Sequence, residues 1–224
     1  MRHQNICIVL SILLLLNSCA SYNPYPYPAL QPDETPYHQL VENVEVGVMP
    51  LMDKGQMSAF FENNLREGDI LPILIAFDNK GRNSYKVELD NIRLILPGGE
   101  DLRKTEFERV YGALKKNVEG RTFGGFLGGA AIAAASFLIL FPAIIIMPVL
   151  TAIGTKDVNR KIRRDLWQKT LQETFFLHPA STVQGFVFFN LKEGKSLEGS
   201  KLEINRIQST RGKDATPTNV QIVF

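Results

Sequence analysis

The sequence predicts a mainly β protein of the α+β class: a small antiparallel sandwich interrupted by an apolar helical hairpin and followed by a basic amphipathic helix. Three observations predict this fold. Short apolar segments with period-two alternation, separated by turn-forming residues, occur in both the first and the last third of the chain. Residues 122–155, which lie between them, form a stretch of 34 residues without a charged side chain. The next twenty residues alternate apolar and basic side chains at helical spacing.

Composition narrows the possible functions. The chain has 224 residues, 45% of them hydrophobic, which fits one globular domain with an appendage and excludes a disordered protein. A net charge of +2 provides no overall field to attract nucleic acid, so no nucleic-acid partner is expected. Only 2 Cys and 3 His are present, which leaves little material for a metal site or for cysteine or histidine catalysis.

The first residues predict an export signal. Arg2 precedes an apolar stretch at residues 6–16, which has the length of a signal-peptide core and is too short to span a bilayer. Residues 1–18 are therefore expected to be removed. Residues 19–38, which are rich in Pro and Tyr, predict an extended tether between this terminus and the body.

Residues 16–19 read Leu-Asn-Ser-Cys, which resembles the bacterial lipobox. In that family the cysteine receives a diacylglycerol, the chain is cut just before it, and the new amino terminus is usually acylated. The resemblance implies that Cys19 is the lipidated first residue of the mature protein and contacts membrane lipid. Ala20 is not the Asp that retains such lipoproteins at the inner membrane. The resemblance therefore implies the periplasmic face of the outer membrane, with the inner membrane as the alternative.

The β body is predicted in two parts, residues 39–112 and 179–224. A strand is expected at the start of the first part, followed after a short helical or irregular segment by a β-hairpin of residues 70–77 and 85–96. The second part contains three further strand patterns, at residues 182–190, 201–207 and 219–224. The cadence of these strands is similar to that of immunoglobulin-like domains in bacterial surface lipoproteins. Such sandwiches usually bind or scaffold other molecules.

Residues 113–155 predict the helical hairpin. Pro142 interrupts the uncharged stretch near its middle, so two shorter helices with a bend are expected rather than one long helix. Small residues recur every four positions in two series that would let helices approach closely, as in the glycine zippers of some envelope lipoproteins and pore-forming proteins. These residues are Gly120, Gly124 and Gly128, and Gly125, Gly129 and Ala133. Membrane insertion is the preferred interpretation; burial in a homo-oligomer and burial in a soluble core are the alternatives.

Residues 156–178 predict the amphipathic helix. Val158, Ile162 and Leu166, and then Trp167, Leu171 and Phe175, step by four along its apolar side. Five cations are candidates for contact with lipid headgroups: Lys156, Arg160, Lys161, Arg163 and Arg164. The helix could pack on the sandwich with a solvated basic face or lie on the membrane, and the sequence does not decide between the two.

No catalytic motif stands out, and no cofactor, catalytic or metal-binding residue is predicted. The sequence therefore predicts a non-enzymatic, lipid-anchored envelope lipoprotein that binds or scaffolds an unidentified envelope protein. A pore-forming or transport component assembled through the glycine-rich hairpins is the alternative function. An enzyme that uses carboxylates is a third hypothesis, which no sequence feature supports.

Overall fold

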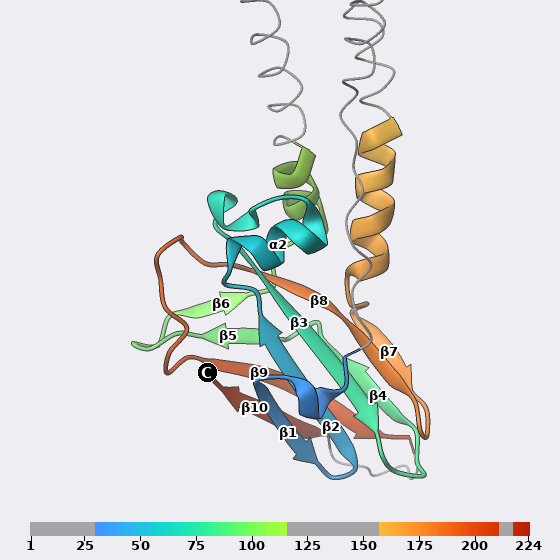
Figure 1. The fold of residues 1–224 in the computed structure, drawn as a ribbon. Coiled ribbons are helices and arrows are strands. Elements are labelled where there is room, and N and C mark those ends of the chain that lie inside the picture. Colours follow the sequence, from blue (N-terminus) through green and yellow to red (C-terminus); the bar gives the residue numbers. More distant parts are fainter. Residues whose placement is uncertain (1–29, 116–156, 211–216) are drawn as a thin grey trace, which may run out of the picture. The chain divides into compact units, whose positions relative to one another are not determined.

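The computed structural model describes residues 30–115, 157–210 and 217–224, coloured in Figure 1. Within these ranges the protein is mainly β, with two antiparallel sheets and a few short helices. The chain divides into two compact units. The described residues of the larger unit are 30–113, 165–210 and 217–224, and those of the smaller unit are 114–115 and 157–164. Contacts between elements reported below lie within the larger unit.

The first sheet has four strands in the order β1-β2-β3-β8. They are β1 (Tyr37–Val41), β2 (Val44–Pro50), β3 (Ile70–Asn79) and β8 (Thr182–Asn190). All ten residues of β3 are buried, as the continuous apolar run at residues 70–77 predicts. On one side β3 pairs with β2, and on the other it pairs with β8 from Ile70↔Asn190 to Asp78↔Thr182.

The second sheet follows the order β6-β5-β9-β4-β7, and β10 pairs with the other side of β9. Its strands are β4 (Tyr85–Glu88), β5 (Arg93–Ile95), β6 (Asp101–Arg103), β7 (Thr174–Leu177), β9 (Lys201–Ser209) and β10 (Thr218–Val223). The strands predicted at residues 182–190, 201–207 and 219–224 are confirmed as β8, β9 and β10, to within two residues.

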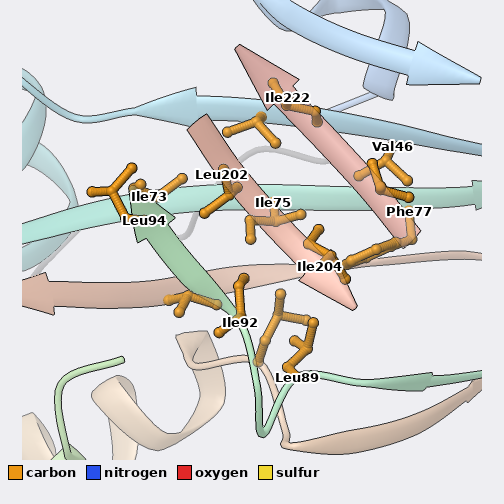
Figure 2. Packing of buried hydrophobic residues seen from close by; sticks show 14 of the residues in the cluster. Val46, Ile73, Ile75, Phe77, Leu89, Ile92, Leu94, Leu202, Ile204 and Ile222 are labelled. Carbon is orange, nitrogen blue, oxygen red and sulfur yellow. The ribbon is translucent and has the colours of Figure 1, made fainter. Parts of the chain in front are cut away.

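One hydrophobic cluster joins the two sheets, because its buried members come from strands of both. Figure 2 shows Ile73, Ile75 and Phe77 of β3 lying among residues of the second sheet. Those neighbours include Leu94, Leu202 and Ile204. The alternating apolar positions of the strands therefore meet in a shared core, as expected for packed sheets.

The helices within the described ranges are short. They are the 3₁₀ turns η1 (Pro32–Glu34) and η2 (Leu65–Gly68), the α-helix α2 (Lys54–Phe61), and the helical residues 107–115 and 157–169. The side chain of Asp53 caps α2 by accepting a hydrogen bond from the Gln56 amide at 3.0 Å. Phe61 of α2 packs edge-to-face on Phe186 and Phe188 of β8, with ring centroids 5.0 and 5.9 Å apart.

The predicted hairpin of residues 70–77 with 85–96 is wrong. β3 and the strands after it belong to different sheets, because the turn after β3 carries the chain across the core. A cluster of turn-forming residues between two strands is found both in a β-hairpin and in a connection between two sheets, so the sequence does not distinguish the two. The second predicted strand is also divided into β4 and β5, with a turn at residues 90–91.

The body begins earlier than predicted, inside the segment assigned to the tether. Thr35 is buried, and its hydroxyl donates to the Pro32 carbonyl at 2.6 Å and accepts a hydrogen bond from the Val48 amide at 3.1 Å. A Cβ on Gly47 of β2 would lie 2.5 Å from the Pro32 Cα, far inside van der Waals contact. The absent side chain at Gly47 therefore allows η1 to pack directly on β2.

Gly47→Ala tests this close approach. The added methyl group overlaps backbone atoms of Pro32, so we expect the free energy of unfolding to fall by about 1–3 kcal/mol. Chemical denaturation of the full chain measures the change. Gly112→Ala is the matched control: a Cβ there meets nothing within 4 Å, and the residue is helical. We expect the control to be neutral or stabilising by up to about 1 kcal/mol. Equal effects of the two substitutions would contradict the contact.

Candidate membrane-contact helix

Residues 157–169 form a helix with two different sides. Val158, Ile162 and Leu166 have exposed fractions of 8%, 0% and 0%. They recur every four residues and therefore lie on one side of the helix. This confirms the first part of the predicted apolar side.

The described cations of this helix lie on the solvent side. Arg160, Lys161, Arg163 and Arg164 are all exposed. The Arg160 side chain is 76% exposed and its Nη1 lies 3.9 Å from a carboxylate oxygen of Asp157, an ion pair that contributes little because both groups are solvated. The contact of these four residues with lipid headgroups stays a prediction.

The predicted helix extends too far toward the carboxyl end. It ends at residue 169, and Phe175 belongs to β7. Trp167 is 67% exposed rather than buried on the apolar side, and its ring meets Phe107 edge-to-face with centroids 5.9 Å apart. At 100° per residue, Trp167 lies about 180° from Val158, which places it on the opposite side of the helix. The spacing by four continued in the sequence after the helix had ended.

Lys169, at the end of the helix, was not predicted as a site residue. Its side chain is only 3% exposed. The Nζ atom donates to the Phe60 carbonyl of α2 at 2.6 Å and to Asp165 Oδ2 at 2.9 Å, and lies 5.7 Å from the centre of the Phe61 ring. The i,i+4 spacing of Asp165 and Lys169 was the sequence signal available for this contact. Lys169 thus attaches the end of the helix to α2.

Burial also affects the pKa of this lysine. Desolvation lowers the pKa of Lys169 from its ordinary value of 10.5, and the carboxylates of Asp165 and Glu62 oppose that shift. Between its folded pKa and 10.5 the unfolded chain binds more protons at this position than the folded chain. The contribution of Lys169 therefore makes the folded state more stable as the pH rises through that window.

After Lys169 the chain runs close to β8. The Leu171 amide donates to the Phe186 carbonyl at 3.0 Å, and Thr170 forms an isolated parallel bridge with Phe186. A Cβ on Gly185 would lie 2.9 Å from the Lys169 carbonyl oxygen, so the glycine makes room for this crossing. These contacts fix where the chain that follows the helix joins the body.

A groove of about 520 Å³ lies near η2 and the loop after β8, with Met57, Arg66 and Glu193 among its lining residues. Arg66 Nη1 and Nη2 donate to the Leu191 and Lys192 carbonyls at 2.5 and 2.7 Å. Burial lowers the pKa of Arg66, while the nearby Glu193 and Asp69 carboxylates oppose the shift. Arg66 is thus occupied in holding the loop after β8.

The other predicted site residues lie outside the described residues. They are Cys19, the hairpin residues Gly120, Gly124, Gly125, Gly128, Gly129 and Ala133, and Lys156. Within the described ranges, no helix is long and apolar enough to cross a membrane. The same ranges contain no group of three or more His, Cys, Asp or Glu side chains that could hold a metal ion.

Comparison with known proteins adds no relative: no family model, curated protein or solved structure matches this chain.

Lys169→Ala tests the attachment of the helix to α2. Loss of the two hydrogen bonds and of the packing on Phe61 is expected to lower the free energy of unfolding by about 1–3 kcal/mol. Lys161→Ala, on the exposed side of the same helix, is the control and should change it by no more than about 0.5 kcal/mol. Denaturation of the full chain at neutral pH provides both values.

The pH dependence of unfolding gives a second measure for the same variants. The difference in the free energy of unfolding between wild type and Lys169→Ala should grow as the pH rises from neutral toward 10.5. Only the wild type has the lysine whose lowered pKa stabilises the folded state over that range. A constant difference over that range would contradict a depressed pKa at Lys169.

Proposed function

We propose that this chain is a non-enzymatic envelope lipoprotein, acylated at Cys19, whose two-sheet body is held at a membrane by the uncharged stretch of residues 122–155. The pairing of strands across that stretch is the observation that carries the proposal. β3 lies before the stretch and β8 lies after it, and the two strands pair over nearly their whole length. β4 likewise pairs with β7 and β9.

This pairing limits how the uncharged stretch can meet a bilayer. A single span would put β3 and β8 on opposite sides of the membrane, where they could not pair. A hairpin that enters and leaves on the same side keeps both flanks with one body. Thirty-four uncharged residues allow two segments of about 15 residues with a short bend between them, each reaching about 22 Å as a helix, which suits an inserted hairpin. We therefore propose the hairpin rather than a single span.

The basic side of residues 157–169 supports a hairpin whose flanks lie at the membrane surface. The helical residues 157–169 follow the uncharged stretch closely in the sequence, and four of them, at positions 160, 161, 163 and 164, are exposed cations. Each cation close to an anionic membrane surface contributes about 1 kcal/mol to binding. Trp167, exposed on the same helix, is a residue type enriched at membrane–water interfaces. We propose that these side chains lie at the headgroups while the hairpin lies in hydrocarbon.

The two-sheet body is proposed to bind or scaffold other envelope components. Its immunoglobulin-like character is part of the proposal and rests on the cadence of the strands. The glycine series at residues 120–133 is proposed to pack the two halves of the hairpin, or hairpins of neighbouring copies, against one another.

Charge reversal tests the headgroup contact. In a full chain that carries Cys19→Ala, we expect the triple substitution Arg160→Glu, Lys161→Glu and Arg164→Glu to weaken binding to anionic vesicles by about 3 kcal/mol, roughly a hundredfold. Cosedimentation measures binding. Trp167, the only tryptophan, reports independently, because its emission should shift to the blue on anionic vesicles.

The matched control is Arg82→Glu, Lys192→Glu and Lys201→Glu, three exposed cations outside the helix that give the same change in net charge. We expect this control to bind several-fold more tightly than the helix variant. Equal binding by both triple variants would contradict a specific role for the helix and leave only an effect of total charge.

A further inference from the structure

β1 is a free edge of the first sheet. It is the outermost strand in the order β1-β2-β3-β8, and among the described residues it pairs with β2 alone. The opposite edge, β8, is partly covered: the Thr105 and Leu171 amides donate to carbonyls of Phe188 and Phe186. Residues 38–40 of β1 are all exposed, and Leu40 has an exposed fraction of 61%. Within the described part of the chain, the sheet therefore has one edge whose main chain is accessible to a further strand.

The register shows which main-chain groups of β1 face outward. The amide of Lys80, which follows β3, donates to the Asn43 carbonyl, so the main-chain carbonyl of Asn43 points toward β3. Because main-chain groups alternate in direction along a strand, those of Val44 and Val46 point toward β1. Their partners in β1 are Val41 and Gln39. His38 and Leu40, the alternate residues, direct their amide and carbonyl groups away from β2. These groups form the free edge.

The free edge has no charge to discourage pairing. Neither β1 (Tyr-His-Gln-Leu-Val) nor the neighbouring β10 (Thr-Asn-Val-Gln-Ile-Val) contains Asp, Glu, Lys or Arg. A groove of about 350 Å³ lies between them, lined by residues 36–39 and 221–223. The edge strand β6, in contrast, carries Asp101 and Arg103. Charged side chains are a common protection of strand edges, and β1 lacks it.

We propose that β1 is an interface for a second copy of this chain, with the two β1 strands paired antiparallel about a twofold axis at Gln39. The free edge is self-complementary in that register. His38 of each copy faces Leu40 of the other, so each outward amide meets an outward carbonyl. On the core side, Tyr37 meets Val41 of the other copy, an aromatic and β-branched pair of the kind that stabilises cross-strand contacts.

The absence of charge favours a second copy as the occupant. Two identical strands that carried charges would bring like charges into proximity across the axis, which destabilises pairing. Here no such repulsion arises, and the four-stranded sheets of two copies would form one sheet of eight strands. This interface lies in the β body and does not depend on the membrane proposal.

Gln39→Cys tests the register. In the proposed pair the two copies of residue 39 face each other without hydrogen bonds between them, with Cα atoms about 4.5 Å apart, a separation that a disulfide can bridge. The variant is made in a full chain that carries Cys7→Ser and Cys19→Ser, so that it contains one thiol. Under mild oxidation in detergent we expect a disulfide-linked dimer to form about tenfold or more faster than for the control Arg82→Cys, because pairing raises the effective thiol concentration.

A second variant separates strand pairing from random collision. Leu40→Pro removes an outward amide but none of the ladder bonds to β2, so the fold, checked by its unfolding transition, should persist. Adding Leu40→Pro to Gln39→Cys should reduce crosslinking to the rate of Arg82→Cys. Crosslinking of Gln39→Cys at the control rate would overturn the interface. So would crosslinking unaffected by Leu40→Pro in a folded protein, or a disulfide product in which the second chain is a different protein.

Discussion

The ladder between β3 and β8 is the constraint on which the rest of the structure depends. β3 is buried along its whole length, and its pairing with β8 joins parts of the chain separated by more than a hundred residues. The shared core cannot form until both strands are present, because β2, β3 and β8 supply one side of it and the second sheet supplies the other. The segments that precede and follow residues 122–155 in the sequence therefore belong to one body.

Specific contacts hold the segment around residues 169–171 on the body. Lys169 is bound to α2, Leu171 is hydrogen-bonded to β8, and Gly185 leaves space for the chain between them. Phe60 and Phe61 of α2 also pack on Phe186 of β8. The end of the basic helix is therefore attached to the strand that closes the first sheet, which links a surface proposed for the membrane to the most buried part of the fold.

The sequence predicts correctly those strands whose burial produces an apolar pattern. The continuous apolar run of β3 and the alternation in β9 were enough to predict these strands, because a strand buried on both faces is apolar throughout and a strand buried on one face alternates. The sequence-based prediction was wrong where the same pattern occurs in two different structures. The turn after β3 looks like a hairpin turn yet crosses the core. Phe175 continues the spacing by four of Trp167 and Leu171 yet lies in β7, whose pairing with β4 overrides the local pattern.

The candidate site was recovered in part for similar reasons. Exposed cations opposite a buried stripe follow from helix geometry, so the exposure of Arg160 and its neighbours could be predicted. The burial of Lys169 was not predicted: the spacing of Asp165 and Lys169 indicates their ion pair, but nothing local indicates that the Phe60 carbonyl of α2 lies close enough to accept a hydrogen bond from it. Here the partners are a carbonyl of Phe60 and a carboxylate four residues away.

The central claim is that the protein has two independent attachments to lipid, one at Cys19 and one in residues 122–155. Fractionation of cells that express the full chain tests it most directly, with Cys19→Ala, a deletion of residues 122–155, and both changes together. Limited proteolysis checks that the β body remains folded in each. We predict that each single change leaves the protein in the membrane fraction and that only the combination releases it. Release by either single change, or retention of the folded double variant, would contradict the account.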